Sequence, residues 1–356
     1  MKFPFRLEKA PAPSPMRRAL LPIRAMVATF LSGIIPIMIA GANPLYAYYE
    51  MFLGAFGGII AISEVFVRAA PLMLTGLAIS VAFRAKFWNI GAEGQLYAGA
   101  ILGSVVALNF ADWPFWVHIP FMIIAGMVGG ALCALPGILK IKVKVGDVVT
   151  TLMLNFIMIT LTSYLVQNVL TDPYTGWPQS APITDSATYP ILIPYTRFHL
   201  GIIIAIVFTV VIGYGLIEYT PLGYEIKAVG SNEIASRLAG INPTAVTIKT
   251  AIISGAFAGL AGIGEVAGIR HHLIATLSPV PIGYGLSGVV IAVMAGLNPL
   301  WVAVVAFFFS VIINGSQTMS RVTGVPIFLS EVFQGLALFF TLFFLYLDQY
   351  KIRRVR

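Results

Sequence analysis

The segment PLGYEIKAVGSNEIASRLAGINPTAVTIK, residues 221–249, is the longest polar interval in the second half of the chain, and apolar stretches flank it on both sides. Ser231 is a good N-cap for a short helix, because its hydroxyl can accept a hydrogen bond from a free N–H of the first turn. Glu233 and Arg237 then form an i,i+4 pair in the favourable order. Gly240 ends the predicted helix, since glycine tolerates the left-handed conformation.

This predicted helix is amphipathic and is followed directly by another. Its apolar residues gather on one side: Ile234, Ala235, Leu238 and Ala239. Asn242-Pro243 is typical of the cap and first position of the next helix. A capped amphipathic helix between two apolar spans is either a docking surface for a soluble partner or an interfacial helix lying on lipid headgroups. The local pattern alone leaves both interpretations open.

The composition is that of a polytopic membrane protein. The chain has 356 residues, of which 58% are hydrophobic and only 10% are charged. Several segments exceed the roughly 20 apolar residues needed to cross a bilayer. The net charge of +8 does not indicate a nucleic-acid partner, because the basic residues lie at the ends of spans, as membrane orientation requires. Cys133 is the single cysteine, so no internal disulfide can form. We therefore predict an all-α membrane protein.

The apolar segments predict about ten transmembrane helices. They cover residues 23–41, 68–84, 90–110, 115–139, 148–169, 199–218, 249–269, 285–297, 299–319 and 332–348. Aromatic and glycine residues are frequent at 45–60, which we expect to lie along the outer interface. The segment 285–297 would be only about 20 Å long as a helix, short of the roughly 30 Å core. It predicts a short or broken helix, which is tolerated where it is buried in protein or lines a cavity.

Basic residues predict the orientation. With both termini in the cytoplasm, 18 of the 22 Lys and Arg residues lie on the cytoplasmic side and four lie outside. The four outside are Arg68, Arg197, Arg270 and Arg321. The predicted domains are a cytoplasmic tail at 1–22, a transmembrane domain at 23–348 and a basic cytoplasmic C-terminus at 349–356. The polar loop 220–248 is then cytoplasmic, and the proline- and aromatic-rich segment 170–198 is external, where it is a candidate docking surface for a binding protein.

A second polar motif, FWNIGAEGQ at residues 87–95, begins the third span. Asn89, Glu93 and Gln95 are polar groups at the entry to an apolar helix, so they must find partners inside the bundle or in water. They either line a translocation path or cap the helix and pair with the basic residues of 84–86. The position of Glu93 near the cytoplasmic end favours the capping interpretation for that residue.

Other polar side chains interrupt later spans. Asn155 lies inside the fifth span and either contacts substrate or bonds a neighbouring helix; the helix bond is favoured. Three polar pairs lie near the outer ends of spans: Glu265 with Arg270, Asn314 with Gln317, and Glu331 with Gln334. These pairs either form a rim that receives substrate or are solvated at the interface. The substrate-path candidates are Asn89, Glu93, Gln95, Asn155, Asn314 and Gln317.

Small residues recur at four-residue spacing in two spans. Gly255 and Gly259 lie in the seventh span, and Gly126 and Gly130 lie in the fourth. Small residues at this spacing let helices approach closely inside a membrane. We interpret both patterns as helix packing.

Two runs of residues carry a resemblance to a known family. Ile234-Ala235-Ser236, followed after three residues by Gly240, resembles the cytoplasmic coupling loop of ABC importer permeases, which has Glu-Ala-Ala, three residues and Gly. This chain departs from that pattern at Ile234 and Ser236. The run KAVGSN at 227–232 with AGINP at 239–243 resembles the branch that imports simple sugars and nucleosides. The same branch is resembled by residues 87–95, SGA at 254–256 and GLNP at 296–299.

The resemblance implies a function and a set of partners. The chain would be a permease subunit of a bacterial ABC importer in the plasma membrane, forming the path for a small neutral solute such as a nucleoside, a purine or a simple sugar. Its partners would be a cytoplasmic ATPase that carries ATP and Mg²⁺, a second and different permease subunit, and an external substrate-binding protein. The 223–241 loop would couple to the ATPase. The coupling residues would be Glu233, Ala235, Ser236, Arg237 and Gly240.

Several chemistries have no motif in this sequence. No G-x-x-x-x-G-K-[ST] phosphate loop occurs, so we expect ATP hydrolysis on a partner chain and no enzyme activity or cofactor here. His271-His272 is the one adjacent histidine pair and makes a poor metal site, since neighbouring helical positions point about 100° apart. The alternative function is a self-sufficient secondary transporter or channel. That class needs ion-coupling charges in mid-membrane, whereas the acidic residues are predicted near span ends.

Overall fold

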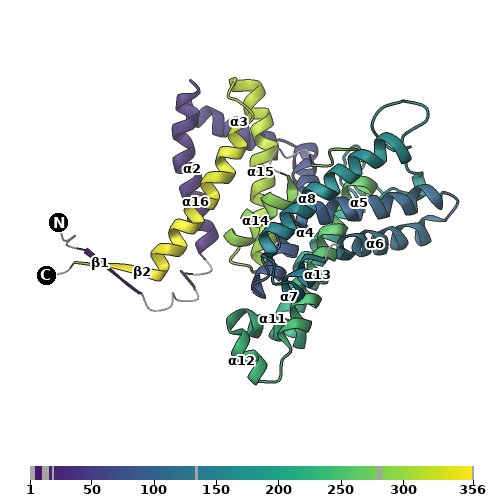
Figure 1. Cartoon of the computed structure of the whole chain (residues 1–356). Coiled ribbons are helices and arrows are strands. Elements are labelled where there is room, and N and C mark those ends of the chain that lie inside the picture. Colours follow the sequence, from purple (N-terminus) through teal and green to yellow (C-terminus); the bar gives the residue numbers. More distant parts are fainter. Residues whose placement is uncertain (1–4, 10–15, 18–19, 133–134, 279–282, 355–356) are drawn as a thin grey trace.

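The structure is a computed structural model that describes residues 5–9, 16–17, 20–132, 135–278 and 283–354 (Figure 1). Cys133 and parts of the predicted N-terminal tail lie outside the described residues. Two short strands join the ends of the chain: β1 (Phe5–Lys9) pairs antiparallel with β2 (Tyr350–Arg354). Apart from three isolated β-bridges between residues 171 and 274, the rest of the described secondary structure is helical, as predicted, whereas the terminal ribbon was not foreseen.

Each predicted span corresponds to a helix or a run of helices. The simple ones are α2 (Leu21–Ile39), α4 (Ile59–Arg84), α5 (Ala92–Asn109), α14 (Tyr284–Met294), α15 (Pro299–Thr323) and α16 (Leu329–Gln349). The composite ones are α6 (Phe115–Leu132) with α7 (Leu135–Lys142), α8 (Asp147–Tyr164) with η1 (Leu165–Val169), α9 (Leu200–Ile206) with η3 (Val207–Gly213) and α10 (Tyr214–Tyr219), and α13 (Pro243–Glu265) with η4 (Val266–Arg270). In the part of the chain that the structure describes, eight segments are long and apolar enough to cross a membrane, and α14 is a shorter apolar helix.

Two helices confirm or correct the predicted boundaries. α14 has 11 residues and begins after Gly283, whose φ of 85° suits glycine, so the predicted short helix is confirmed. α4 begins at Ile59 and not at residue 68. Glu64 and Arg68 lowered the apparent hydrophobicity of its first turns, but Glu64 pairs with Arg197 and both residues lie within the helix.

An extra helix, α3 (Pro44–Phe56), occupies the segment that was predicted to lie along the outer interface. Asn43 caps it, because its side-chain oxygen accepts from the N–H of Leu45 and Tyr46. α3 packs on the C-terminal half of α15, where Asn314 Nδ2 donates to Gly54 O over 3.3 Å. In Figure 1 it lies near the upper ends of α2 and α15.

The centre of the bundle consists of α4 and α13. In their most apolar windows 89% and 72% of residues are buried, against 17% for α8, so α8 lies at the periphery. α13 packs against α6 through the two glycine patterns. A Cβ added to Gly130 would lie 1.9 Å from Gly255 O, and one added to Gly259 would lie 2.1 Å from Gly126 O. The predicted small-residue packing is therefore confirmed.

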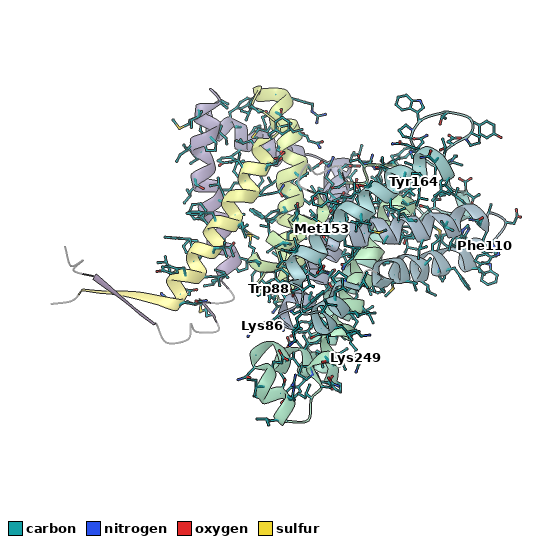
Figure 2. All side chains as sticks on the ribbon, viewed as in Figure 1. Lys86, Trp88, Phe110, Met153, Tyr164 and Lys249 are labelled. Atoms are coloured by element: carbon teal, nitrogen blue, oxygen red, sulfur yellow. The ribbon has the colours of Figure 1, made fainter. Side chains whose placement is uncertain are left out.

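Ion pairs gather at one end of the bundle. Glu218 pairs with Arg84 at 3.3 Å and with Lys227 at 2.9 Å, and Lys140 pairs with Asp147 at 2.6 Å. These basic residues belong to the set predicted to be cytoplasmic. Figure 2 shows Lys86 and Lys249 toward the same end, with Phe110 and Tyr164 far from it. One end of the molecule is thus basic, as the positive-inside rule requires of a cytoplasmic surface.

At the opposite end, residues 170–198 form a folded cap with one short 3₁₀ turn, η2 (Asp185–Ala187). Its backbone bonds to the turn that follows α13. Ser180 N–H donates to Leu273 O, Ile183 N–H to His271 O and Tyr189 N–H to Ala267 O, each over 2.8 Å. The cap is therefore fixed to the central helix.

Candidate functional site: a cytoplasmic helix, a polar entry and an outer depression

The polar segment that separates the sixth and seventh spans consists of two short helices, α11 (Pro221–Ser231) and α12 (Glu233–Leu238). The predicted cap, Ser231, is wrong. Ser231 ends α11 and donates to Lys227 O, whereas Asn232 adopts an extended conformation and its Oδ1 accepts from Ile234 N–H (3.0 Å) and Ala235 N–H (3.1 Å). The cap therefore falls one residue later than predicted.

The other local predictions for this segment are confirmed. Arg237 Nη2 lies 3.3 Å from Glu233 Oε1, and both side chains are exposed, so the pair adds only tenths of a kcal/mol. Gly240 has a φ of +84° and ends α12. Asn242 caps α13 by accepting from Ala245 N–H over 3.3 Å. The sharp turn between α12 and α13 is thus fixed by one glycine and one asparagine.

The apolar side of α12 faces away from the protein. Ile234 and Leu238 are 75% and 86% exposed, whereas Ser236 is the buried residue of the helix. Figure 1 shows α12 at the tip of the molecule, beyond α11. α11 in turn fits closely against the end of α4, since a Cβ added to Gly230 would lie 1.7 Å from Arg84 O. α12 therefore presents apolar side chains outward on a base that is packed against the central helix.

The polar residues of the entry segment form a closed network. Asn89 and Gln95 are fully buried. Asn89 Nδ2 donates to Gln95 Oε1 over 2.9 Å and to Ser254 Oγ over 2.8 Å. Ser254 Oγ donates onward to Ala78 O over 2.7 Å, so the network joins α4, α5 and α13. In this conformation Asn89 and Gln95 bond each other, and Asn89 also bonds Ser254; their place on a substrate path stays a prediction.

A ladder of three side chains on α8 holds the same entry segment. Asp147, Thr151 and Asn155 follow at four-residue spacing and so share a face of the helix. Trp88 N–H donates to Asp147 Oδ2 (2.8 Å) and Ile90 N–H to Thr151 Oγ1 (3.2 Å).

Asn155 makes the last and tightest rung of this ladder. Its Oδ1 accepts from Gly94 N–H over 2.7 Å, and its Nδ2 donates to Ile90 O over 2.9 Å. The side chain bridges the start of α5, which confirms the helix bond favoured for Asn155. Its contact with substrate stays a prediction.

Glu93 has a partner that differs from the predicted one. The sequence favoured pairing with the basic residues of 84–86, but Arg84 pairs with Glu218 instead. The Glu93 carboxylate is buried and accepts from Gly285 N–H at the start of α14. The approach is so close that a Cβ on Gly285 would lie 2.3 Å from Glu93 N. Glu93 thus joins the start of α5 to the start of the short helix.

Asn314 and Gln317 line an open depression of about 860 Å³ between the turn that joins α3 to α4 and the end of α15. Thr318 and Arg321 of the same helix face complete a polar stripe along its wall, and the other charged lining residues are Glu64, Arg68 and Arg197. The structure therefore brings two of the predicted path residues together with three of the four arginines predicted to be external. A role in substrate passage stays a prediction.

Glu265 and Gln334 are not solvated at the interface, so that interpretation of their pairs is wrong, and a role in receiving substrate stays a prediction. Both are 1% exposed. Tyr284 Oη donates to Glu265 Oε1 over 2.7 Å, and Ser287 Oγ donates to Gln334 Oε1 over 3.1 Å. The sequence placed them near span ends, but residues of α14 contact both of them inside the bundle. Sequence reasoning also missed Tyr284, for which no local signal exists because its partner lies 19 residues away.

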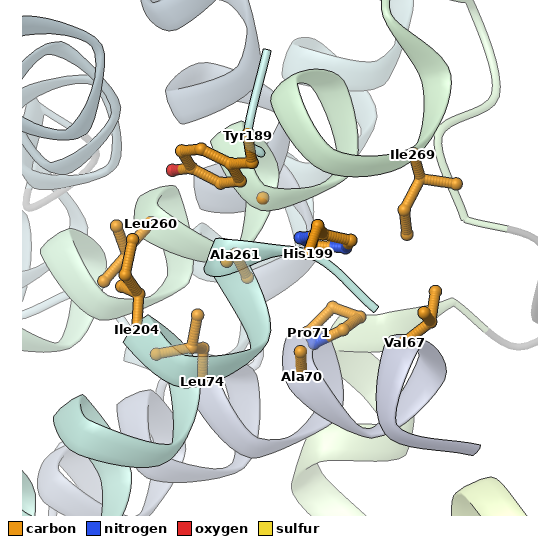
Figure 3. A pocket seen from close by; sticks show the side chains of 12 residues that line it. Val67, Ala70, Pro71, Leu74, Tyr189, His199, Ile204, Leu260, Ala261 and Ile269 are labelled. Atoms are coloured by element: carbon orange, nitrogen blue, oxygen red, sulfur yellow. The ribbon is translucent and has the colours of Figure 1, made fainter. Parts of the chain in front are cut away.

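Figure 3 shows a small cavity under the external cap, lined mainly by apolar side chains of α4, α9 and α13. His199 faces it and is 2% exposed, and neither ring nitrogen has a partner. Burial, followed by the nearby charges of His271 and Arg197, lowers the pKa of His199 to about 4. Among the described residues, no group of three or more His, Cys, Asp or Glu is placed to hold a metal ion.

Eight membrane-crossing segments among the described residues, a basic end and an exposed apolar helix at that end define a polytopic membrane protein. The chain belongs to the family described as branched-chain amino acid transport system / permease component, whose model matches residues 61–342. It is a permease subunit of an ATP-driven ABC importer and a multi-pass protein of the bacterial plasma membrane.

Three relatives span nearly the whole chain. A glucose ABC transporter permease of Haloferax volcanii is 34% identical over 93% of this chain and 89% of its own length. A nucleoside ABC transporter permease of Lactococcus lactis is 33% identical over 91% and 90%. A guanosine ABC transporter permease of Bacillus subtilis is 33% identical over 86% and 88%. No solved structure matches the chain significantly.

Proposed function

We propose that this chain forms one wall of the path for a small neutral solute, a nucleoside or purine or a simple sugar, and that α12 receives the motion of a cytoplasmic ATPase. The names of the three relatives, which specify glucose, nucleosides and guanosine, support this substrate class. ATP and Mg²⁺ belong to the ATPase, and this chain binds no cofactor. Its role is transport and not catalysis.

The observation that carries the proposal is the exposed apolar side of α12. Ile234 and Leu238 have no partner within the described residues that would remove them from water. Contiguous exposed apolar side chains are costly to keep in water and commonly mark an interface. The alternative, a helix lying on lipid headgroups, fits poorly, because α12 stands at the tip of the molecule beyond α11 (Figure 1). A groove on a soluble subunit suits this geometry.

Close contacts connect α12, through α11, to the central helices, so a movement of α12 can be transmitted into the bundle. α11 abuts the end of α4 at Arg84. Lys140 Nζ donates to Lys86 O over 2.8 Å and pairs with Asp147, which holds Trp88. From there α5 reaches α14 through Glu93. A displacement of α12 would thus be passed to the entry segment and the short helix.

Two further partners complete the proposed importer. The interior polar side chains at 89–95 bond within the protein, to each other and to α13 and α14, so we infer that the path runs along a face that a second, different permease subunit closes. An external substrate-binding protein would dock on the cap. Three large side chains at the cap surface support this assignment: Tyr174, Trp177 and Tyr195 are 94%, 70% and 98% exposed.

Charge placed on α12 tests the coupling. We expect Leu238→Asp to abolish co-purification of the ATPase in mild detergent and to reduce ATP-dependent uptake at least tenfold, because a carboxylate would be buried unpaired in the interface. The matched control is Tyr195→Asp, at a similarly exposed position on the cap, which should retain the ATPase. Full recovery of the ATPase with Leu238→Asp would contradict the assignment of α12.

A further inference from the structure

A charged cluster lies inside the bundle, between the outer depression and the start of α14. Glu265, at the end of α13, is 1% exposed, and Tyr284 Oη donates to its Oε1 over 2.7 Å. Its other oxygen, Oε2, lies 3.9 Å from Arg270 Nε. That separation is too long for a hydrogen bond. The charges of Arg270 and Arg68 both act on this carboxylate.

The cluster contains hydrogen-bonding atoms without partners. Among the described residues, Glu265 Oε2, Arg270 Nε, and Arg68 Nε and Nη1 are buried and make no hydrogen bond. Buried polar atoms in folded proteins are almost always paired, and exceptions call for an explanation such as a missing ligand. One acceptor, Glu265 Oε2, therefore lies 3.9 Å from one free donor, Arg270 Nε, and the charge of Arg68, which carries two more free donors, acts on the same carboxylate. Tyr284 fixes the carboxylate so that Oε2, and not Oε1, is the free oxygen.

The cluster is electrically balanced. Six charged side chains act on one another around Glu265, namely Arg68, Arg197, Arg270, Glu64, Glu93 and Glu265 itself, whereas Arg321 on the wall of the depression is exposed. Three are basic and three are acidic, so a charged ligand would leave an uncompensated charge in a region of low dielectric. A neutral ligand that offers a donor to Oε2 and an acceptor to the guanidinium groups would satisfy the free atoms without disturbing the balance.

Access to the cluster comes from the outer depression. Arg68 lines that depression and also carries the buried, unpartnered Nε and Nη1. It therefore belongs to both places, at the floor of the open depression and at the edge of the buried cluster. A solute that enters the depression would meet Arg68 before Glu265.

We propose that Glu265, Arg270 and Arg68 form a recognition site for a neutral solute that presents a hydrogen-bond donor beside an acceptor. The amide edge of a purine base has this pattern, and so do the vicinal hydroxyls of a sugar. The proposal deepens the proposed function and rests on it. The solute donor bonds Glu265 Oε2, and the solute acceptor receives N–H groups from Arg270 and Arg68. Charge-assisted bonds of this kind are strong and directional.

Equilibrium binding to the purified permease tests the site, with inosine and 1-methylinosine as probes. Inosine offers an N–H beside a carbonyl, and methylation replaces that N–H with an N–CH₃ group that cannot donate. We expect 1-methylinosine to bind on the order of tenfold or more weakly, because Glu265 Oε2 loses its partner. Glu265→Gln should weaken inosine by a similar factor and shrink the difference between the probes. Arg68→Lys, which keeps the charge, should weaken both probes equally.

Asp348→Asn is the matched control. Asp348 is also a buried carboxylate that pairs with an arginine, Arg24, over 2.7 Å, but it joins α16 to α2. Its substitution should leave the ratio between the probes unchanged. A purely structural role for Glu265 would lower thermal stability without changing that ratio.

Binding of glucose distinguishes the two kinds of solute that present this pattern, a purine amide edge and the vicinal hydroxyls of a sugar. Glucose binding that falls with Glu265→Gln, while neither inosine probe binds, assigns the site to vicinal hydroxyls and supports the proposal. Binding of inosine and glucose that is unaffected by both Glu265→Gln and Arg68→Lys overturns it. In that case, if Leu238→Asp still reduces ATP-dependent uptake, the proposed function is supported although the recognition site is not.

Discussion

At the scale of single residues, Asn155 shows how one side chain can hold a helix start inside a membrane protein. Its amide bridges Ile90 O and Gly94 N–H, which no helical bond satisfies. We expect Asn155→Ala to lower stability by about 2–4 kcal/mol, because both groups stay buried without a partner. The measurement is thermal unfolding in detergent. Asn168→Ala, at an exposed asparagine that bonds only Tyr164 O, should change little.

His199 makes stability depend on pH. Its pKa is about 4 in the folded protein and near 6.5 when exposed, so the unfolded chain takes up a proton first as pH falls. Stability is then fully present above about pH 6.5, declines by about 3 kcal/mol as pH falls to about 4, and levels off below. Groups that face the ring, His271, Arg197 and Glu64, modulate this value.

Unfolding profiles between pH 7.5 and 4 check this dependence on His199. We expect His199→Gln to flatten the profile in that window. His271→Asn should keep most of the slope, because asparagine tolerates the left-handed backbone at that position (φ 60°). A slope that persists in His199→Gln would assign the effect to another group.

At the scale of elements, the packing of α6 on α13 depends on the absence of side chains. A Cβ added to Gly130 would lie 1.9 Å from Gly255 O. A Cβ added to Gly264 of α13 would meet no atom within 4 Å. The same substitution should therefore have opposite effects. We expect Gly130→Ala to destabilise by roughly 1–3 kcal/mol or more, and Gly264→Ala to be neutral or to stabilise by up to about 1 kcal/mol. Equal unfolding temperatures for the two variants would refute close packing at Gly130.

The short helix α14 gains its position from other elements and not from its own length. Glu93 of α5 accepts from Gly285 N–H at its start, and Tyr284 and Ser287 bond Glu265 and Gln334 from neighbouring helices. Thr75 of α4 also donates to Tyr284 O, so this 11-residue helix has polar contacts to four other helices. This arrangement places α14 between the entry segment and the charged cluster. A movement of the entry segment would therefore shift α14 and, through it, the cluster.

At the scale of the whole molecule, apolar length and small-residue spacing predicted the helices and their packing, because both are local properties of the chain. Gly240 was predictable for the same reason. Local signals failed where two adjacent residues compete, as at Ser231 and Asn232. The end of α11 decides between them, and a pattern fixes helix ends only to within a few residues.

Partners far apart in the chain were also beyond local reasoning. Glu93 bonds Gly285, 192 positions away, and no spacing rule links them. Glu265 was predicted at the surface because it lies near the end of a span, but it is buried and bonded by Tyr284 of α14. The position of a residue along a span can be predicted from the sequence. Its burial by segments far away in the chain can be seen only in the folded structure.

The orientation of the whole molecule is open to a direct test. Leu238 and Tyr195 are 86% and 98% exposed, so cysteines at the two positions should be similarly reactive, yet they lie at opposite ends of the bundle. With Cys133 replaced by serine, we expect a membrane-impermeant maleimide to label Tyr195→Cys in right-side-out vesicles and Leu238→Cys only in inside-out vesicles. The basic end of the bundle predicts this outcome, because translocating its lysines and arginines is disfavoured. Labelling of both variants from the same side would show that the one span between residues 195 and 238, Leu200–Tyr219, does not cross the membrane, and α12 could then not meet a cytoplasmic ATPase.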